Sequence, residues 1–124
     1  MVTAPAIART NPYAQDVSFI DVPWTTGGGG FTDPIDLAGL RPVLVIVPSS
    51  FTGTGIGVQF SEDGSNWYPV GDRDGVLTLA AAAGRAVTIP YDVIYPLDGW
   101  VRFDMGATPA SDTNLRVGVT TPRP

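Results

Sequence analysis

Apolar and polar residues alternate along three segments of the chain, 54–63, 98–106 and 114–121. A period of two puts the apolar side chains on one side of an extended strand and the polar ones on the other. The pattern therefore predicts strands that turn one face to a core and the other to solvent. The predicted core positions are Ile56, Val58, Phe60, Val101, Phe103, Met105, Leu115, Val117 and Val119.

Further strands are predicted between these segments. Residues 17–24 and 85–96 are rich in β-branched and aromatic residues, and Pro90 makes the second of these an edge strand or a bent one. Residues 43–47 are apolar at every position, so a central strand within 41–50 is expected to bury both faces. The remaining predictions are strands within 66–70 and 71–80 and a loop or single turn over 80–84.

A polar turn at 62–66 leads directly into two aromatic residues, Trp67 and Tyr68. Gly64 in this turn favours a β-hairpin between strand 54–63 and the returning strand. Because neighbouring residues of a strand face opposite ways, one of the two aromatic side chains is expected in the core and the other outside.

These elements predict an all-β protein. About eight or nine strands, with a turn signal roughly every 8–12 residues, are typical of an antiparallel β-sandwich or barrel. A jelly roll or a related Greek-key sandwich fits best. We divide the chain into an extended N-terminal arm (1–15), a sandwich domain (16–121) and a short C-terminal tail (122–124).

Composition narrows the possible chemistry. The 124 residues include neither His nor Cys, which removes the nucleophilic triads and leaves a zinc site only carboxylates as ligands. The chain is therefore not expected to be an enzyme or to hold a cofactor. Its net charge of −5 disfavours nucleic-acid binding. No apolar run approaches the roughly 18–20 residues of a membrane span, and the N-terminal residues lack the apolar segment of a signal peptide.

Three local patterns contain residue types that bind ligands in other proteins. Asp72 and Asp74 could pair for glycoside hydrolysis or bind calcium, but an Asp-x-Asp-Gly turn is their more common role. Glu62 and Asp63 are a second possible calcium site. The loop 25–30, which ends in four glycines, lacks the Gly-Lys-Ser/Thr ending of a phosphate-binding loop.

The polar face of strand 98–106 offers a candidate binding surface, because it carries Trp100 beside Arg102 and Asp104. A surface Trp next to an Arg suits a protein interface, and it also suits a sugar. Trp67 is expected to pack as part of a wall. The candidate interface residues are Pro5, Ile7, Arg9, Trp24, Phe31, Trp100 and Arg102.

Two stretches, "VQFSEDGSNWYPVGD" and "GWVRFDMG", resemble a pattern common in small virion proteins of tailed bacteriophages. There a strand leads into a Ser-x-Asp-Gly-x-x-Trp turn, and a later strand reads Tyr/Trp-Val-Arg. In this chain the resemblance covers roughly residues 55–106 and rests on Ser61, Asp63, Gly64, Trp67, Trp100, Val101 and Arg102.

The resemblance implies a capsid decoration, or cement, protein that is made in the host cytoplasm and binds the major capsid protein on the outer surface of the head. Such proteins often act as oligomers, commonly trimers, and the arm 1–15 would then clamp a neighbour. The alternative is a tail- or fibre-associated adhesin or a carbohydrate-binding β-sandwich module.

Overall fold

The computed structural model describes residues 17–72, 75–94 and 96–120. The predicted arm and tail lie outside the described residues, and so do the interface candidates Pro5, Ile7 and Arg9.

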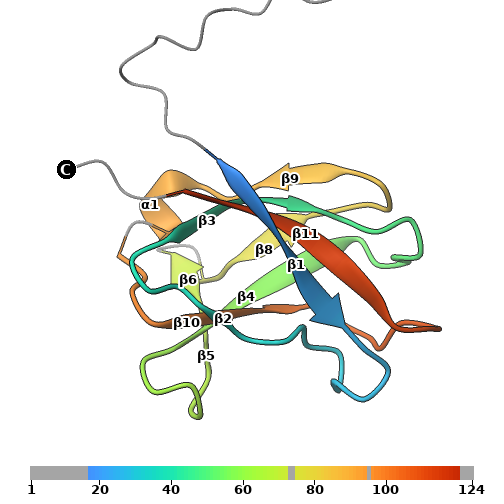
Figure 1. Ribbon diagram of the computed structural model, residues 1–124, viewed down its shortest axis with the longest axis horizontal. Helices are drawn as coiled ribbons and strands as arrows, with labels where there is room; N and C mark the ends of the chain where they lie inside the picture. Colours follow the sequence, from blue (N-terminus) through green and yellow to red (C-terminus); the bar gives the residue numbers. More distant parts are fainter. Residues whose placement is uncertain (1–16, 73–74, 95, 121–124) are drawn as a thin grey trace, which may run out of the picture.

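Two antiparallel sheets pack face to face (Figure 1). One sheet has the strand order β1-β11-β3-β9; the other has the order β2-β10-β4-β5, with β8 also paired to β4. The bounds are β1 Ser18–Trp24, β2 Ile35–Asp36, β3 Arg41–Ile46, β4 Gly55–Ser61, β5 Tyr68–Pro69, β6 Gly71–Asp72, β7 Gly75–Val76, β8 Thr78–Ala80, β9 Ala86–Thr88, α1 Tyr91–Ile94, β10 Trp100–Asp104 and β11 Thr113–Thr120.

The pairing of the strands is nested. β1 pairs with β11, β2 with β10, β3 with β9 and β4 with β8. This is the order produced when one long hairpin is rolled over itself, so that successive segments alternate between the two sheets. The arrangement is that of a jelly roll, and the prediction of an all-β antiparallel sandwich is confirmed.

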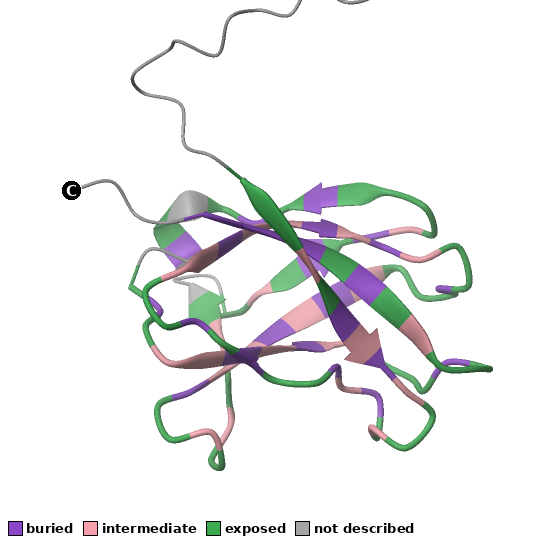
Figure 2. Cartoon of the chain, viewed as in Figure 1, coloured by how far each residue is buried: buried purple, intermediate pink, exposed green. Residues whose placement is uncertain are grey.

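The core lies between the sheets and is filled from alternate positions of each strand. Val101, Phe103 and Met105 point inward from β10 and its end, and Leu115, Val117 and Val119 point inward from β11; all six are at most 3% exposed. Figure 2 shows this alternation of buried with more exposed positions along the strands. Of the predicted core positions, only Phe60 is half-buried rather than buried.

The prediction that segment 41–50 buries both faces is wrong. β3 does lie inside its sheet, between β11 and β9, and Val45 is fully buried. Its outward side chains Leu44 and Ile46 are only half-buried, however, because nothing in the described part of the chain forms a third layer over them.

The predicted strand 85–96 is shorter than expected. β9 ends at Thr88, and the helical turn α1 follows Pro90. Proline suits the start of a helix, because its fixed φ fits the first turn and its missing N–H would have no partner there. The N–H of Val93 donates to the carbonyl of Pro90 at 3.1 Å, which closes the turn.

Candidate functional site

The turn between β4 and β5 is held by two side chains, those of Ser61 and Asp63. The Ser61 hydroxyl oxygen accepts hydrogen bonds from the backbone N–H groups of Asp63 (3.3 Å) and Gly64 (2.8 Å), and the hydroxyl donates to the Asp63 carboxylate at 2.9 Å. That carboxylate also accepts the backbone N–H groups of Ser65 (2.8 Å) and Asn66 (2.9 Å) and the side-chain amide of Asn66 (2.8 Å). A polar, glycine-containing loop is thereby given one defined conformation.

These hydrogen bonds lower the pKa of Asp63, since the N–H groups of Asn66 and Ser65 stabilise its charged form. Both of its carboxylate oxygens already accept hydrogen bonds from within the turn. Within the described residues, no group of three or more acidic, histidine or cysteine side chains is placed to hold a metal ion. The side chain of Asp72 and all of Asp74 lie outside the described part of the chain.

The turn supports Trp100 from one side. Gly64 has a φ of +82°, and a Cβ built on it would lie 3.3 Å from Cε2 of the Trp100 indole. Ser61 is also the direct cross-strand partner of Trp100 in the β4–β10 pairing. The two halves of the sequence resemblance, far apart along the chain, therefore meet at this indole.

Arg102 lies against two aromatic rings. Its guanidinium carbon is 3.9 Å from the centre of the Phe31 ring and 4.5 Å from the centre of the Trp67 ring. Its Nε–H donates to Oε1 of Gln59, the opposite residue on β4, at 2.8 Å. Partial burial lowers the pKa of Arg102, and the neighbouring Asp104 carboxylate opposes this shift. The guanidinium is thus fixed in place, with a face of each ring against it.

The glycine run 25–30 brings Phe31 to this position. The N–H of Gly28 donates to the carbonyl of Thr25 at 3.1 Å, and the N–H of Phe31 donates to the carbonyl of Gly28 at 3.2 Å. A side chain at Gly28 would collide with the Phe31 carbonyl oxygen, 2.6 Å from the built Cβ. Two consecutive tight turns then place Phe31 in an isolated bridge with Asp104 of β10.

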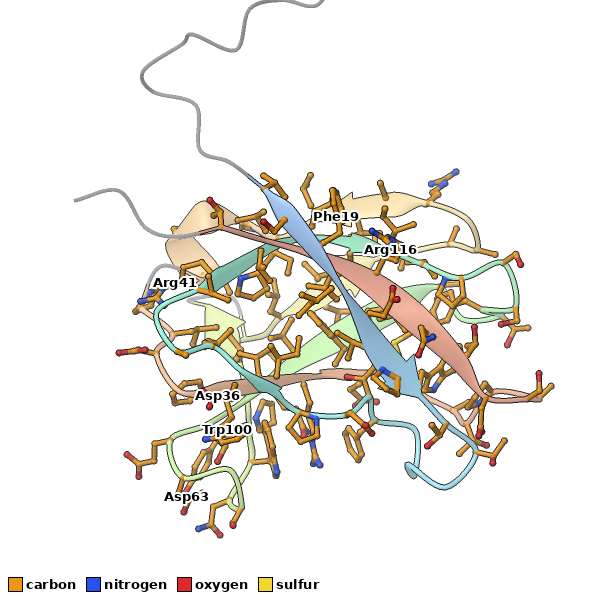
Figure 3. All side chains as sticks on the ribbon, in the orientation of Figure 1. Phe19, Asp36, Arg41, Asp63, Trp100 and Arg116 are labelled. Carbon is orange, nitrogen blue, oxygen red and sulfur yellow. The ribbon has the colours of Figure 1, made fainter. Side chains whose placement is uncertain are left out.

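We call the outer surface of this sheet the aromatic–arginine face and define it by Phe31, Gln59, Trp67, Trp100 and Arg102. All five side chains are half-buried. Asp36 of β2 borders it as the cross-strand neighbour of Trp100. Figure 3 shows Asp36 and Trp100 close together on this side of the molecule, with Phe19 and Arg116 on the opposite side.

The arrangement suits a protein partner better than a sugar. A pyranose stacks on an uncovered aromatic face, whereas here Arg102 covers one face of Phe31 and one of Trp67, and the turn approaches Trp100. Partly buried Trp and Arg side chains, already held in place by their neighbours, are the residues that most often dominate the energy of protein interfaces.

The structure separates the predicted interface residues. It brings Phe31, Trp100 and Arg102 together on the aromatic–arginine face. The prediction of Trp24 as an interface residue is wrong, because only 3% of this side chain is exposed. Its ring packs edge-on against Phe51, and its indole N–H donates to the carbonyl of Ala107. Trp24 therefore belongs to the core.

The expectation that either Trp67 or Tyr68 enters the core is also wrong. Trp67 is half-buried on the outer face, and Tyr68 is 57% exposed. Tyr68 is paired with Phe60, so it faces the inner side, but β5 is only two residues long and runs along the margin of the sandwich. The core does not extend beneath it.

The sequence pattern did not identify two residues of the site, Gln59 and Asp36. Gln59 lies on the polar side of an alternating strand, and its pairing with Arg102 depends on a register that the sequence pattern does not give. Asp36 belongs to a strand of two residues, too short for any periodic signal.

A hollow lies between loops 50–55 and 105–110 and has a volume of about 630 Å³. Trp24, Phe51 and Met105 form its apolar part, and small or hydroxyl-bearing residues form the rest. None of the described residues that line it carries a charge.

Comparison with known proteins does not identify a relative: no protein-family model matches the chain, and no curated protein matches its sequence. Among the described residues, no helix has the length and apolar character needed to cross a membrane.

Proposed function

We propose that this chain is a non-enzymatic protein-binding module and, specifically, a capsid decoration protein of a tailed bacteriophage. In this proposal it binds the major capsid protein on the outer surface of the head and strengthens the junctions between capsomers. The observation that carries the binding role is the aromatic–arginine face, where Arg102 contacts both Phe31 and Trp67 beside a half-buried Trp100.

The aromatic–arginine face supports this role because its side chains are already held in place before a partner binds. Arg102 already has a hydrogen bond to Gln59 and two ring contacts, so it loses little side-chain freedom when a partner covers it. Trp100 has its turn-facing side supported by Gly64, and it is half-buried in the free protein. Preorganised aromatic and arginine side chains are efficient anchors for a protein partner.

The virion role rests on the resemblance, whose residues the fold joins into one unit. Ser61 and Asp63 hold the turn, Gly64 meets Trp100, and Trp67 meets Arg102. A decoration protein would act by adding buried interface area across a joint that pressure from packaged DNA tends to open. Each contact contributes modestly after association costs, and the symmetric repetition of the capsid multiplies the effect.

Immunogold labelling of intact particles from the source lysate tests the proposal. Gold over the heads would support a decoration protein. Gold confined to the tail or its tip would reject the capsid role and favour the adhesin alternative, which a glycan-binding screen would then examine. Particles without label would reject the virion assignment altogether, while the binding role of the aromatic–arginine face would still be testable by pull-down.

A further inference from the structure

The strand β1 is an unusually exposed sheet edge. It is seven residues long, whereas β2, β5, β8 and β9, which lie at the other edges of the two main sheets, have two or three described residues each. Ser18, Phe19 and Asp21 are exposed, although Gly118 and Val119 of the adjacent strand β11 are buried. Short edge strands resist pairing with other chains, and a long one invites it.

The hydrogen bonds of the neighbouring strands show which backbone groups of β1 point outward. Val47 of the β3 segment exchanges hydrogen bonds with Arg85 and Gly84 on the β9 side. Successive residues of a strand direct their N–H and C=O groups to opposite edges. The backbone groups of Leu44 and Ile46 therefore point to β11.

The same alternation continues through the next pairing. The backbone N–H and C=O groups of Val117 in β11 then point to β1, and those of its partner Ile20 point back to β11. Phe19, Asp21 and Pro23 therefore direct their backbone groups away from the sheet. In the described part of the chain, only Pro23 uses that direction, accepting a hydrogen bond from the N–H of Asp33 at 2.9 Å.

We propose that two copies of this chain pair through β1, antiparallel, with Ile20 on the two-fold axis. Phe19 of each copy then lies opposite the partner's Asp21, and the outward N–H and C=O groups of both residues form reciprocal hydrogen bonds. The four-stranded sheets of the two copies become one continuous sheet.

The side chains on the outer surface fit this register. Val17 and Phe19 are 44% and 41% exposed, and the partner strand would cover part of both. Asp21 forms an ion pair with Arg116 at 3.5 Å, and Arg116 also lies over Phe19, 5.5 Å from the ring centre. The pairing places each Asp21 beside the partner's Phe19. Because the partner's Arg116 lies over that ring, the negative Asp21 of one copy approaches the positive Arg116 of the other.

Pro23 limits the contact to the exposed part of β1, because it has no N–H and its carbonyl is already bonded to Asp33. The pairing is isologous and closes with two copies, unlike the trimer that the resemblance implies. This inference concerns self-association of the free chain and does not rest on the proposed function.

A single introduced cysteine tests the pairing directly, because the chain has no Cys of its own. Residues on the axis form a non-hydrogen-bonded pair, about 4.5 Å apart between Cα atoms, within the range of roughly 4.4–6.8 Å that a disulfide spans. We expect Ile20→Cys to give a covalent dimer with oxidised glutathione. Thr88→Cys, exposed on β9 at the other edge of the same sheet, should form no covalent dimer.

The sign of a charge at position 19 tests the register. Phe19→Asp would face the partner's Asp21 and should reduce the mass measured by light scattering from two copies to one. Phe19→Lys would face the same carboxylate favourably and should keep the dimer, as should Thr88→Asp.

Three outcomes would overturn the proposal: a wild-type mass of one or three copies, a folded Ile20→Cys that does not cross-link, or equal effects of Asp and Lys at position 19. Circular dichroism of each variant establishes that it is folded. If Ile20→Cys does not fold, the wild-type mass and the two position-19 variants decide.

Discussion

Each sheet of this jelly roll places an arginine against an aromatic ring on its outer surface, and the two contacts differ in construction. Arg102 touches two rings at 3.9 and 4.5 Å, is half-buried, and has a fixed hydrogen bond to Gln59. Arg116 lies 5.5 Å from one ring, and its ion pair with Asp21 has side chains 55% and 59% exposed. A cation near a ring gains most when water is excluded from it, so the first contact is expected to stabilise the fold and the second hardly at all.

The two surfaces also differ in the number of chain segments that build them. The aromatic–arginine face collects side chains from the glycine run, from β4, from the turn before β5 and from β10, all held by turns with specific hydrogen bonds. The Phe19 side of the molecule depends on neighbouring strands alone, β1 and β11. Contacts from several loops exclude more water and set side-chain positions more narrowly.

Arg102→Ala should have the largest effect on stability. The loss of two ring contacts and of the Gln59 hydrogen bond should lower the free energy of unfolding by about 2 kcal/mol. Urea unfolding followed by tryptophan fluorescence would measure it. Arg102→Lys is the matched control; it keeps the charge but not the planar contact, so it should fall between wild type and the alanine variant. No loss in Arg102→Ala would remove the distinction between the two contacts.

Gly64→Ala should cost about 1–2 kcal/mol, because its φ of +82° is unfavourable for alanine and its Cβ would press on Trp100. Gly106→Ala is the control: φ is +80° there, and a Cβ would meet no atom within 4 Å. The excess cost at Gly64 measures the contact with Trp100. Equal losses of unfolding free energy in the two variants would show that the turn does not support the indole.

Acid should destabilise the turn below Trp100 through Asp63. A carboxylate whose pKa is lowered by folding contributes its full stabilisation above the unfolded value, about 3.9, and loses it as the pH falls towards the lower folded value. Thermal melts between about pH 6 and pH 3 should therefore show a smaller loss of Tm in Asp63→Asn than in wild type. Glu62→Gln, at the adjacent exposed carboxylate, should keep the wild-type loss. An unchanged pH dependence in Asp63→Asn would contradict this role.

How far the sequence predicted this structure depends on the range of the interaction. Strict alternation correctly placed Phe103 in the core and Arg102 outside, since side-chain direction in a strand follows from local geometry. It did not predict that Trp67 would reach Arg102, because that contact depends on the register between β4 and β10 and on a turn of defined shape. Trp24 was misplaced for a related reason: its burial depends on packing against Phe51, which the residues around Trp24 in the sequence do not predict.

The smallest expected effect is that of Arg116→Ala. Its exposed ion pair with Asp21 and its distant ring contact should contribute no more than about 0.5 kcal/mol to the stability of the monomer. Salt should weaken even this contribution, since screening acts on exposed charges. Urea unfolding of wild type and Arg116→Ala at low and high ionic strength would measure it, and a loss as large as that of Arg102→Ala would break the comparison.

The central claim is the proposal that the aromatic–arginine face binds the capsid. The most direct test is co-sedimentation of the purified protein with phage heads that do not carry this protein. We expect wild type and Arg116→Ala to bind the heads with the same affinity. In the proposed interface Trp100 is an anchor, so Trp100→Ala should weaken binding by at least about 2 kcal/mol and need roughly 30 times more protein for half-saturation. Trp100→Ala and Arg102→Ala variants that remain folded and bind like wild type would contradict the claim.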